Sequence, residues 1–360
     1  MVRSKVRFLG LAAVALMVVA ACGSTTTGGG GGTPTPTVKV GLVTDIGGLN
    51  DKSFNHLAAL GLAKASSTGS ICSVGGLSCG SSFAVQGDVV ESHNGNDYVP
   101  NLTNFASKGY GLVIGVGFLM QTAIGTVSGQ FPNIHFAIID GAGTDANFND
   151  LKHANVESLL FKEQDAGAMV GVIAGMLEKE GKNKKNKGVI SAVGGQKIPP
   201  VDHYIAGYKW AAQMEDPGIK VLIGYSNDFA DPAKCKPIAQ SQINQGSDVV
   251  FQVAGGCGLG ALQAAGQAGV SSVGVDADQK DADPSVIASA LKKVDVATFT
   301  AIQQVVQGNF QSGATTFSIA NGGAGYQLDN ITLPADVQAE LDKVQGEIKS
   351  GALTPDSVVP

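Results

Sequence analysis

The sequence has few aromatic and charged residues and no excess of basic ones. Aromatic residues make up 6% and charged residues 15% of the 360-residue chain, which contains a single Trp. Lys and Arg number 24 against 30 Asp and Glu, which gives a net charge of −6. Proteins that bind the phosphate backbone of nucleic acids usually present a strongly positive surface. The charge balance therefore argues against a nucleic-acid partner.

Sequence motifs of common catalytic sites are also missing. The chain has no HExxH, GxSxG or GxxxxGK[ST] segment, and GCGLG at 256–260 only approaches the dinucleotide-binding pattern. The five histidines are scattered singly, which favours surface or packing roles over metal binding or general-base catalysis. We therefore expect a protein that is not an enzyme and has no cofactor or metal. An enzyme built from carboxylates at strand ends is the alternative.

No long apolar run follows the N-terminal segment, and the run within that segment is short. Three basic residues precede an apolar stretch at 8–19, which is too short to span ~30 Å of hydrocarbon as a helix. The sequence VAAC then ends at Cys22, the pattern of a lipoprotein signal. This predicts a signal peptide at 1–21 and a palmitate-bearing Cys22 that anchors the protein to the extracytoplasmic face of the cell membrane. An ordinary signal peptide is the alternative.

A flexible tether is expected after the anchor. Residues 22–37 are almost entirely Cys, Gly, Ser, Thr and Pro, a composition that cannot bury apolar surface. The remaining chain, from Val38 onward, is long enough for two lobes. Without 1–21, which carries three positive charges and no negative ones, the net charge becomes −9.

The cysteines other than Cys22 form an even set of four. In an exported protein such a set is usually paired in disulfides. Proximity in the sequence favours Cys72 with Cys79 and Cys235 with Cys257. Metal binding is the alternative, but the spacing lacks a Cys-x2-Cys pair.

Short β-branched runs alternate with helix-like stretches along the chain, which indicates an α/β fold with parallel sheets. Four expected strands lie at 38–45, 83–92, 112–117 and 135–140, and four more at 188–195, 220–226, 248–256 and 271–278. We expect two Rossmann-like lobes joined by hinge crossovers. The N-terminal lobe takes 38–158 plus part of 290–330, the C-terminal lobe 159–289, and a helix with a tail 331–360.

Ligands of parallel sheets bind beyond the carboxyl ends of the strands. The expected strand ends carry carboxylates, amides, aromatic residues and glycines. Such a rim suits a ligand with hydroxyl groups and a flat ring.

The segment TDIGGLNDKSFN at 44–55 resembles the opening motif of the basic membrane protein family, which includes bacterial purine nucleoside receptors. Further similar segments are GVGF at 115–118, FAIID at 136–140, AGG at 254–256, GVDADQ at 274–279 and the region from Ser289 to Lys292. The resemblance runs from Val38 to about Val296. It implies a type I periplasmic-binding-protein fold and the role of substrate-binding protein of an ABC importer, with a membrane permease as partner.

The resemblance also implies the ligand-binding residues. Asp45 and Asn55 would hydrogen-bond the ligand, Phe54 would stack on a base, and Asp276 with Lys292 would hold ribose hydroxyls. Phe229 is the preferred second aromatic, with Tyr204 behind it. Gly117 and Asp140 are implied as cleft residues.

Other interpretations of these residues stay open at this point. Phe54 could be a core residue of its helix, because apolar residues follow it at helical spacing. Asp45 could cap the same helix, and Lys293 could replace its neighbour Lys292. For the whole protein, the alternative is a ligand-sensing receptor for a sugar or another polar metabolite that signals through a membrane partner.

Overall fold

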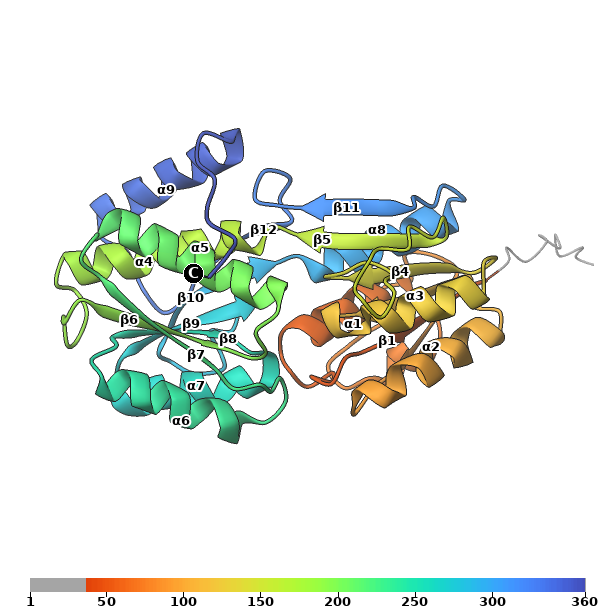
Figure 1. Ribbon diagram of the computed structural model, residues 1–360, viewed down its shortest axis with the longest axis horizontal. Helices are drawn as coiled ribbons and strands as arrows, with labels where there is room; N and C mark the ends of the chain where they lie inside the picture. The colour runs from red at the N-terminus through yellow and green to blue at the C-terminus, as the bar shows by residue number, and fades with distance from the viewer. Residues whose placement is uncertain (1–36, 360) are drawn as a thin grey trace, which may run out of the picture. The chain divides into compact units, whose positions relative to one another are not determined.

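The computed structural model describes residues 37–359 (Figure 1). The predicted signal peptide, Cys22 and nearly all of the predicted tether lie outside these residues. Within 37–359, no helix combines the length and the apolar character needed to span a bilayer.

The first lobe is built on a six-stranded sheet with strand order β11-β5-β4-β3-β1-β2, and all neighbouring strands run parallel. Its strands are β1 (Val38–Val43), β2 (Val85–Val90), β3 (Leu112–Val116), β4 (His135–Ile139), β5 (Val156–Phe161) and β11 (Gly313–Phe317). Helices α1 (Phe54–Ala65), α2 (Tyr98–Ser107), α3 (Gln121–Gln130) and α8 (Val294–Val306) belong to this N-lobe. Short 3-10 helices cover Ser70–Ser73, Gly95–Asp97 and Phe118–Met120.

The second lobe repeats this plan with strand order β12-β10-β9-β8-β6-β7. Its strands are β6 (Val189–Gly194), β7 (Lys220–Tyr225), β8 (Val249–Val253), β9 (Ser271–Asp276), β10 (Val286–Lys292) and β12 (Ala324–Leu328). Only the β10–β12 pair is antiparallel among these strands. The helices of this C-lobe are α4 (Glu163–Lys179), α5 (Pro199–Glu215), α6 (Pro232–Asn244), α7 (Gly255–Ala268) and α9 (Ala335–Ser350).

Both faces of each sheet are buried, as expected for parallel sheets. In β3, Leu112 and Ile114 contribute to the core under α1 and α8, whereas Val113 points to the core under α2 and α3. In β8, Phe251 packs towards α4 and α5, and Val250 towards α6 and α7. The α/β class and the two mostly parallel sheets predicted from the sequence are confirmed.

Glycines let α4 and α5 pack closely. A Cβ atom at Gly167 would lie 2.2 Å from the carbonyl oxygen of Tyr204, and one at Gly171 would lie 2.4 Å from that of Tyr208. Both distances are shorter than any real Cβ contact, so these positions accept no side chain without a shift of the helices. The close contact fixes Tyr204, which lines the cleft described below.

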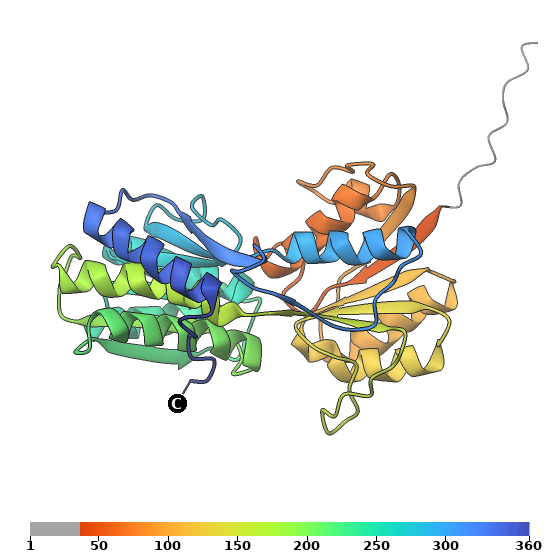
Figure 2. The ribbon, with the colours of Figure 1, turned by 90° about the horizontal axis from the view of Figure 1, so that it is seen from above.

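The chain passes between the lobes three times, from β5 to α4, from β10 to α8 and from β11 to β12. These strands form the β11-β5 edge of one sheet and the β12-β10 edge of the other. Figure 2 shows the two lobes and the segments that join them from above. The crossovers therefore gather at one side of both sheets.

The prediction of four strands in each block was incomplete, because each sheet has six. The lobe boundary expected between 158 and 159 falls inside β5, which belongs whole to the N-lobe sheet. A charged residue, Glu157, interrupts its apolar pattern, yet Glu157 is fully buried and accepts hydrogen bonds from Thr315 (2.9 Å) and Gln304 (3.2 Å). The edge strand β11, in which Thr316 is exposed and Thr315 half-buried, gave no apolar signal.

Candidate functional site

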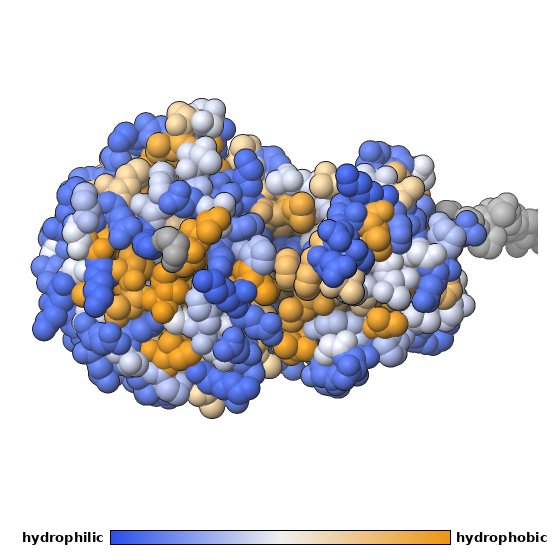
Figure 3. Space-filling model, in the orientation of Figure 1, coloured by the Kyte–Doolittle hydropathy of each residue, from blue (hydrophilic) through white to orange (hydrophobic). Residues whose placement is uncertain are grey.

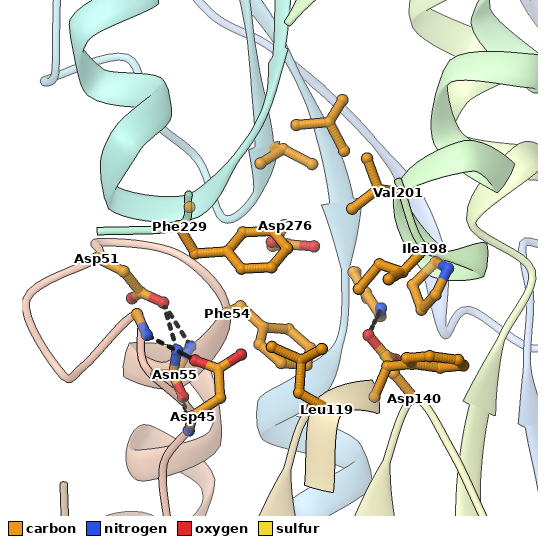
Figure 4. A pocket seen from close by; sticks show the side chains of 18 of the residues that line it. Asp45, Asp51, Phe54, Asn55, Leu119, Asp140, Ile198, Val201, Phe229 and Asp276 are labelled. Atoms are coloured by element: carbon orange, nitrogen blue, oxygen red, sulfur yellow. Dashed lines mark hydrogen bonds and ion pairs between the residues drawn. The ribbon is translucent and has the colours of Figure 1, made fainter. Parts of the chain in front are cut away.

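A cleft lies between the lobes, where the carboxyl ends of both sheets meet (Figure 4). It holds about 580 Å³ of space not filled by protein atoms, the open solvent at its mouth included. All eight residues predicted to touch a ligand line this one cleft, and Tyr204 does too: Asp45, Phe54, Asn55, Gly117, Asp140, Phe229, Asp276 and Lys292. The structure thus brings the predicted residues together, and their contact with a ligand stays a prediction.

The N-lobe wall of the cleft is organised around Asp45. Its Oδ1 accepts hydrogen bonds from the Gly47 amide and from Asn55 Nδ2, both at 2.8 Å. Asn55 Oδ1 accepts from the Asp45 amide at 3.1 Å, and Asn55 Nδ2 also donates to Asp51 Oδ2 at 3.1 Å. The side-chain amide of Asn55 therefore holds Asp45 in place. No described residue donates to Asp45 Oδ2, which leaves that oxygen for a ligand.

Gly117 makes room beside this carboxylate. Its φ is +109°, a conformation that favours glycine, and a Cβ atom there would lie 2.9 Å from Asp45 Oδ2. Burial raises the pKa of Asp45, and the two hydrogen bonds from Gly47 and Asn55 oppose that rise. A glycine at the end of β3 therefore keeps the free oxygen of Asp45 accessible.

Asp51, which the sequence analysis did not single out, caps α1. Its carboxylate accepts hydrogen bonds from the amides of Ser53 (3.0 Å), Asn55 (2.7 Å) and His56 (3.1 Å). Asp51 therefore takes the capping role that was the alternative for Asp45. Burial raises the pKa of Asp51 to about 7, although these amide donors favour the ionised form.

Two aromatic rings reach the cleft from opposite lobes. Phe54 opens α1, and Phe229 lies in the loop between β7 and α6; Figure 4 shows both rings projecting into the cleft. The Phe229 ring packs on Gly195, where a Cβ atom would lie 2.2 Å from it. Tyr204 is only 2% exposed and its hydroxyl is engaged by Asp276, so Phe229 is the better placed of the two candidates for stacking.

Asp276 ends β9 and accepts two hydrogen bonds. Tyr204 Oη donates to its Oδ1 at 3.0 Å, and Ser53 Oγ donates to its Oδ2 at 2.8 Å. Burial raises the pKa of Asp276, while Lys292 lowers it. Both oxygens are thus held by side chains, one of them by a residue of the other lobe.

Lys292 ends β10 at the crossover and lies between two carboxylates. Its Nζ is 2.6 Å from Asp140 Oδ2 and 2.9 Å from Glu163 Oε1, and His203 Nδ1 is 2.9 Å from Glu163 Oε2. Burial favours the neutral amine, but Asp140 and Glu163 outweigh it, and the pKa of Lys292 lies above its ordinary value. Lys293 does not line the cleft.

Asp140 has one oxygen without a partner. Its Oδ1 is buried and accepts no hydrogen bond from any described residue. Burial raises the pKa of Asp140 to about 7, against the attraction of Lys292. A buried acceptor left open in this way is a natural partner for a ligand donor.

The electrostatic character of the cleft is acidic. Among the residues that line it, Lys292 is the single cation, and four carboxylates accompany it: Asp45, Asp51, Asp140 and Asp276. Lys292 is already neutralised by Asp140 and Glu163. The cleft therefore offers mainly hydrogen-bond acceptors, together with apolar side chains such as Leu119, Ile198 and Val201 (Figure 4).

A shallower groove adjoins the cleft on the side of the crossovers. Its lining is largely apolar and shares Phe118, Asp140 and Pro200 with the cleft. Figure 3 shows hydrophobic residues exposed at the junction of the two lobes.

The profile of one protein family, described as ABC transporter substrate-binding protein PnrA-like, matches residues 38–356. The chain belongs to this family. An uncharacterized lipoprotein of Pyrococcus furiosus is 32% identical over 89% of this chain and 77% of its own length. The ABC transporter nucleoside-binding protein BmpA of Lactococcus lactis is 29% identical over 88% of both chains.

Solved structures agree with this family assignment. An ABC transporter solute-binding protein from Aeropyrum pernix K1 superimposes with a TM-score of 0.75 at 27% identity, covering 88% of this chain and 92% of that one. The resemblance to the basic membrane protein family and the type I periplasmic-binding-protein fold are thereby confirmed. As a PnrA-like substrate-binding protein, the chain is expected to hold its ligand in the cleft between the lobes.

Sequence reasoning missed Ser53, Asp51 and Glu163. Asp51 and Ser53 lie inside the opening motif, but their partners are backbone amides and a residue 223 positions away. Glu163 begins α4, and only the fold places it next to Lys292. An acidic residue two positions after β5 was the one signal that could have pointed to Glu163.

Proposed function

We propose that this protein is a lipid-anchored, extracytoplasmic substrate-binding protein that captures a purine nucleoside and delivers it to an ABC permease. The observation that carries the proposal is the pair Phe54 and Phe229, which flank from opposite lobes a cleft whose open polar atoms are acceptors. A purine base presents a flat ring for such a pair. The ribose hydroxyls and the N–H groups of the base supply the donors.

The acidic cleft also argues for a nucleoside over a nucleotide. A 5′-phosphate would face four carboxylates, while Lys292, the one cation of the lining, is held by Asp140 and Glu163. Burying a phosphate there would place like charges together in a poorly solvated site. The name of the Lactococcus lactis relative, a nucleoside-binding protein, supports the same class of ligand.

The membrane location of the proposal rests on the lipoprotein signal pattern ending at Cys22 and on relatives named as lipoproteins. Metabolic labelling with a palmitate analogue tests it. Label should enter the wild-type chain and not the Cys22→Ala variant.

The test of the ligand is a thermal-shift panel on residues 37–360, which contain both lobes and their cores. Inosine, adenosine, guanosine, their 5′-monophosphates, free bases and sugars are compared. A ligand at 100 times its Kd stabilises a protein by about 2.7 kcal/mol. We expect shifts with nucleosides, little with monophosphates, and loss of the shift in Phe54→Ala and Asp276→Ala. A shift with sugars alone would contradict the nucleoside proposal, and chromatographic detection of a product from bound nucleoside would contradict a role in transport without chemistry.

A further inference from the structure

The loop that carries Phe229 contacts two helices, α6 and α7, which are joined by a disulfide. Cys235 lies in α6, which follows the loop, and Cys257 lies in the first turn of α7. The structure pairs these two cysteines with each other, and both are fully buried. Residues 226–231 run past this bridge on their way from β7 to α6.

Backbone contacts connect Phe229 directly to the bridged turn. The Cys257 amide donates a hydrogen bond of 3.1 Å to the carbonyl oxygen of Phe229. Gly255, with a φ of +54°, and Gly256 lie against the same carbonyl, which a Cβ atom would approach to 3.2 and 3.4 Å. Ser226 Oγ lies 3.4 Å from Cys257 Sγ. The main chain of Phe229 is thus held by the residues around Cys257.

The other side of the loop is held by α6. Asp228 Oδ1 accepts hydrogen bonds from the amides of Ala230 (2.7 Å) and Asp231 (2.8 Å), and Asp231 caps α6 through the Ala233 amide. Asp228 Oδ2 lies 2.6 Å from Lys234 Nζ, one residue before Cys235. Any separation of α6 from α7 therefore pulls on both ends of the segment that carries the Phe229 ring.

We infer that the Cys235–Cys257 disulfide positions Phe229 for ligand stacking, so that ligand affinity depends on this bridge beyond its effect on stability. This inference rests on the proposed function, since it takes Phe229 as one wall of the base site. The bridge fixes the spacing of α6 and α7, the helices fix the loop, and the loop holds the ring against Gly195 and facing the cleft.

The second disulfide supplies a matched control. Cys72–Cys79 closes a short segment of the N-lobe, and neither cysteine lines the cleft. Removing it takes away a covalent bridge of the same kind without touching the Phe229 loop.

The experiment is a double-mutant cycle on residues 37–360, read by calorimetric titration with inosine well below the melting temperature. The variants are Phe229→Ala, Cys235→Ala with Cys257→Ala, Cys72→Ala with Cys79→Ala, and each cysteine pair combined with Phe229→Ala. We expect about tenfold weaker binding without the 235–257 bridge, less than twofold without the 72–79 bridge, and no further loss from the 235–257 pair once Phe229 is Ala. Two results overturn the inference. One is that removing the 235–257 bridge weakens inosine binding as much in Phe229→Ala as in the wild type. The other is that the wild type and the variant without this bridge bind inosine with equal affinity.

A ligand-free measurement separates this inference from the proposed function. If the wild-type protein binds none of the nucleosides, the proposed function fails. Hydrogen exchange of the ligand-free protein then still tests whether the Cys235–Cys257 disulfide holds the Phe229 loop in place. The backbone amides of Ala230, Asp231 and Cys257 should exchange faster when the 235–257 bridge is removed. Their exchange rates should not change when the 72–79 bridge is removed. Unchanged exchange at all three amides overturns the inference. If the alanine pair does not fold, Cys235→Val with Cys257→Ala refills the lost volume and takes its place in both measurements.

Discussion

Ser53 Oγ donates a hydrogen bond of 2.8 Å to Asp276 Oδ2, although Ser53 belongs to the N-lobe and Asp276 to the C-lobe. The same hydroxyl lies 3.1 Å from the carbonyl oxygen of Val275. Neither contact involves a ligand, so this bond links the lobes directly. Since ligand affinity falls with the populated fraction of the binding-competent state, a contact present only in the closed form should strengthen binding.

Replacing Ser53 with Ala should therefore weaken nucleoside binding more than it weakens the fold. Loss of one such hydrogen bond amounts to about 1 kcal/mol, roughly a fivefold rise in Kd. Calorimetric titration measures the affinity, and small-angle X-ray scattering of the ligand-free protein should show a larger radius of gyration. Ser66→Ala is the control, because that buried hydroxyl bonds within one lobe. Equal Kd values for wild type and Ser53→Ala would show that the bond does not bias closure.

Gly117→Ala should abolish most binding. The new methyl group would stand 2.9 Å from Asp45 Oδ2 and would be held at a φ of +109°. The backbone strain alone costs on the order of 1–3 kcal/mol, and the methyl group fills the space beside the free acceptor. Gly109→Ala introduces a methyl group at a φ of +70° with open space around it. Urea unfolding should show both variants destabilised, whereas only Gly117→Ala should lose binding in titrations; retained affinity in Gly117→Ala would remove Asp45 Oδ2 from the site.

Lys292→Met should strongly destabilise the protein near neutral pH. It would leave Asp140 and Glu163 buried close together without their cation, and breaking a buried ion pair typically costs about 3–5 kcal/mol. Because the orphaned carboxylates would bind protons more tightly in the fold than in the unfolded chain, the loss should shrink as the pH falls towards 5. Lys280→Met, which breaks an exposed pair with Asp278, should cost well under 1 kcal/mol. Urea titrations at several pH values test this, and a pH-independent loss would contradict it.

Asp51 predicts a second pH dependence. Burial raises the pKa of Asp51 to about 7, whereas the unfolded chain has an ordinary aspartate. The fold therefore binds the proton more tightly, and this group contributes stability at low pH that is lost as the pH rises from about 4 towards 7. The contribution of Asp51 to the free energy of unfolding falls by at most about 1.4 kcal/mol per pH unit. Urea midpoints between pH 5 and 8 should fall more steeply for wild type than for Asp51→Asn, while the exposed Asp281→Asn should follow wild type. Parallel curves for wild type and Asp51→Asn would indicate that the amide donors of α1 keep Asp51 ionised.

The cleft was predictable where its residues follow strands. Asp45, Asp140 and Asp276 each come just after or at the end of a parallel strand, and the carboxyl ends of such strands meet in one place. Residues that contact cleft side chains from distant parts of the sequence were not predictable in this way. Ser53 meets its partner 223 positions away, and Glu163 meets Lys292 at 129 positions. No local pattern encodes such pairs.

One of the missing strands, β5, has a similar explanation. β5 carries the buried Glu157, whose hydrogen-bond partners come from β11 and α8. A charge inside an apolar run normally argues against a buried strand. Only the returning segment after β10 makes that carboxylate acceptable inside the N-lobe.

All three crossovers lie at one edge of the sheets. If the lobes open by a rotation about that edge, the two ends of the cleft move by different distances. A rotation about that edge moves atoms in proportion to their distance from it. Lys292 sits at a crossover, whereas Phe229 follows β7, the strand at the opposite edge of the C-lobe sheet. In such a rotation the Asp140–Lys292–Glu163 end would stay nearly assembled, while the ring of Phe229 would move farthest. For such a rotation we expect ligand capture to be ordered in time, with the group that reaches Asp140 bound first and the ring that Phe229 covers enclosed last.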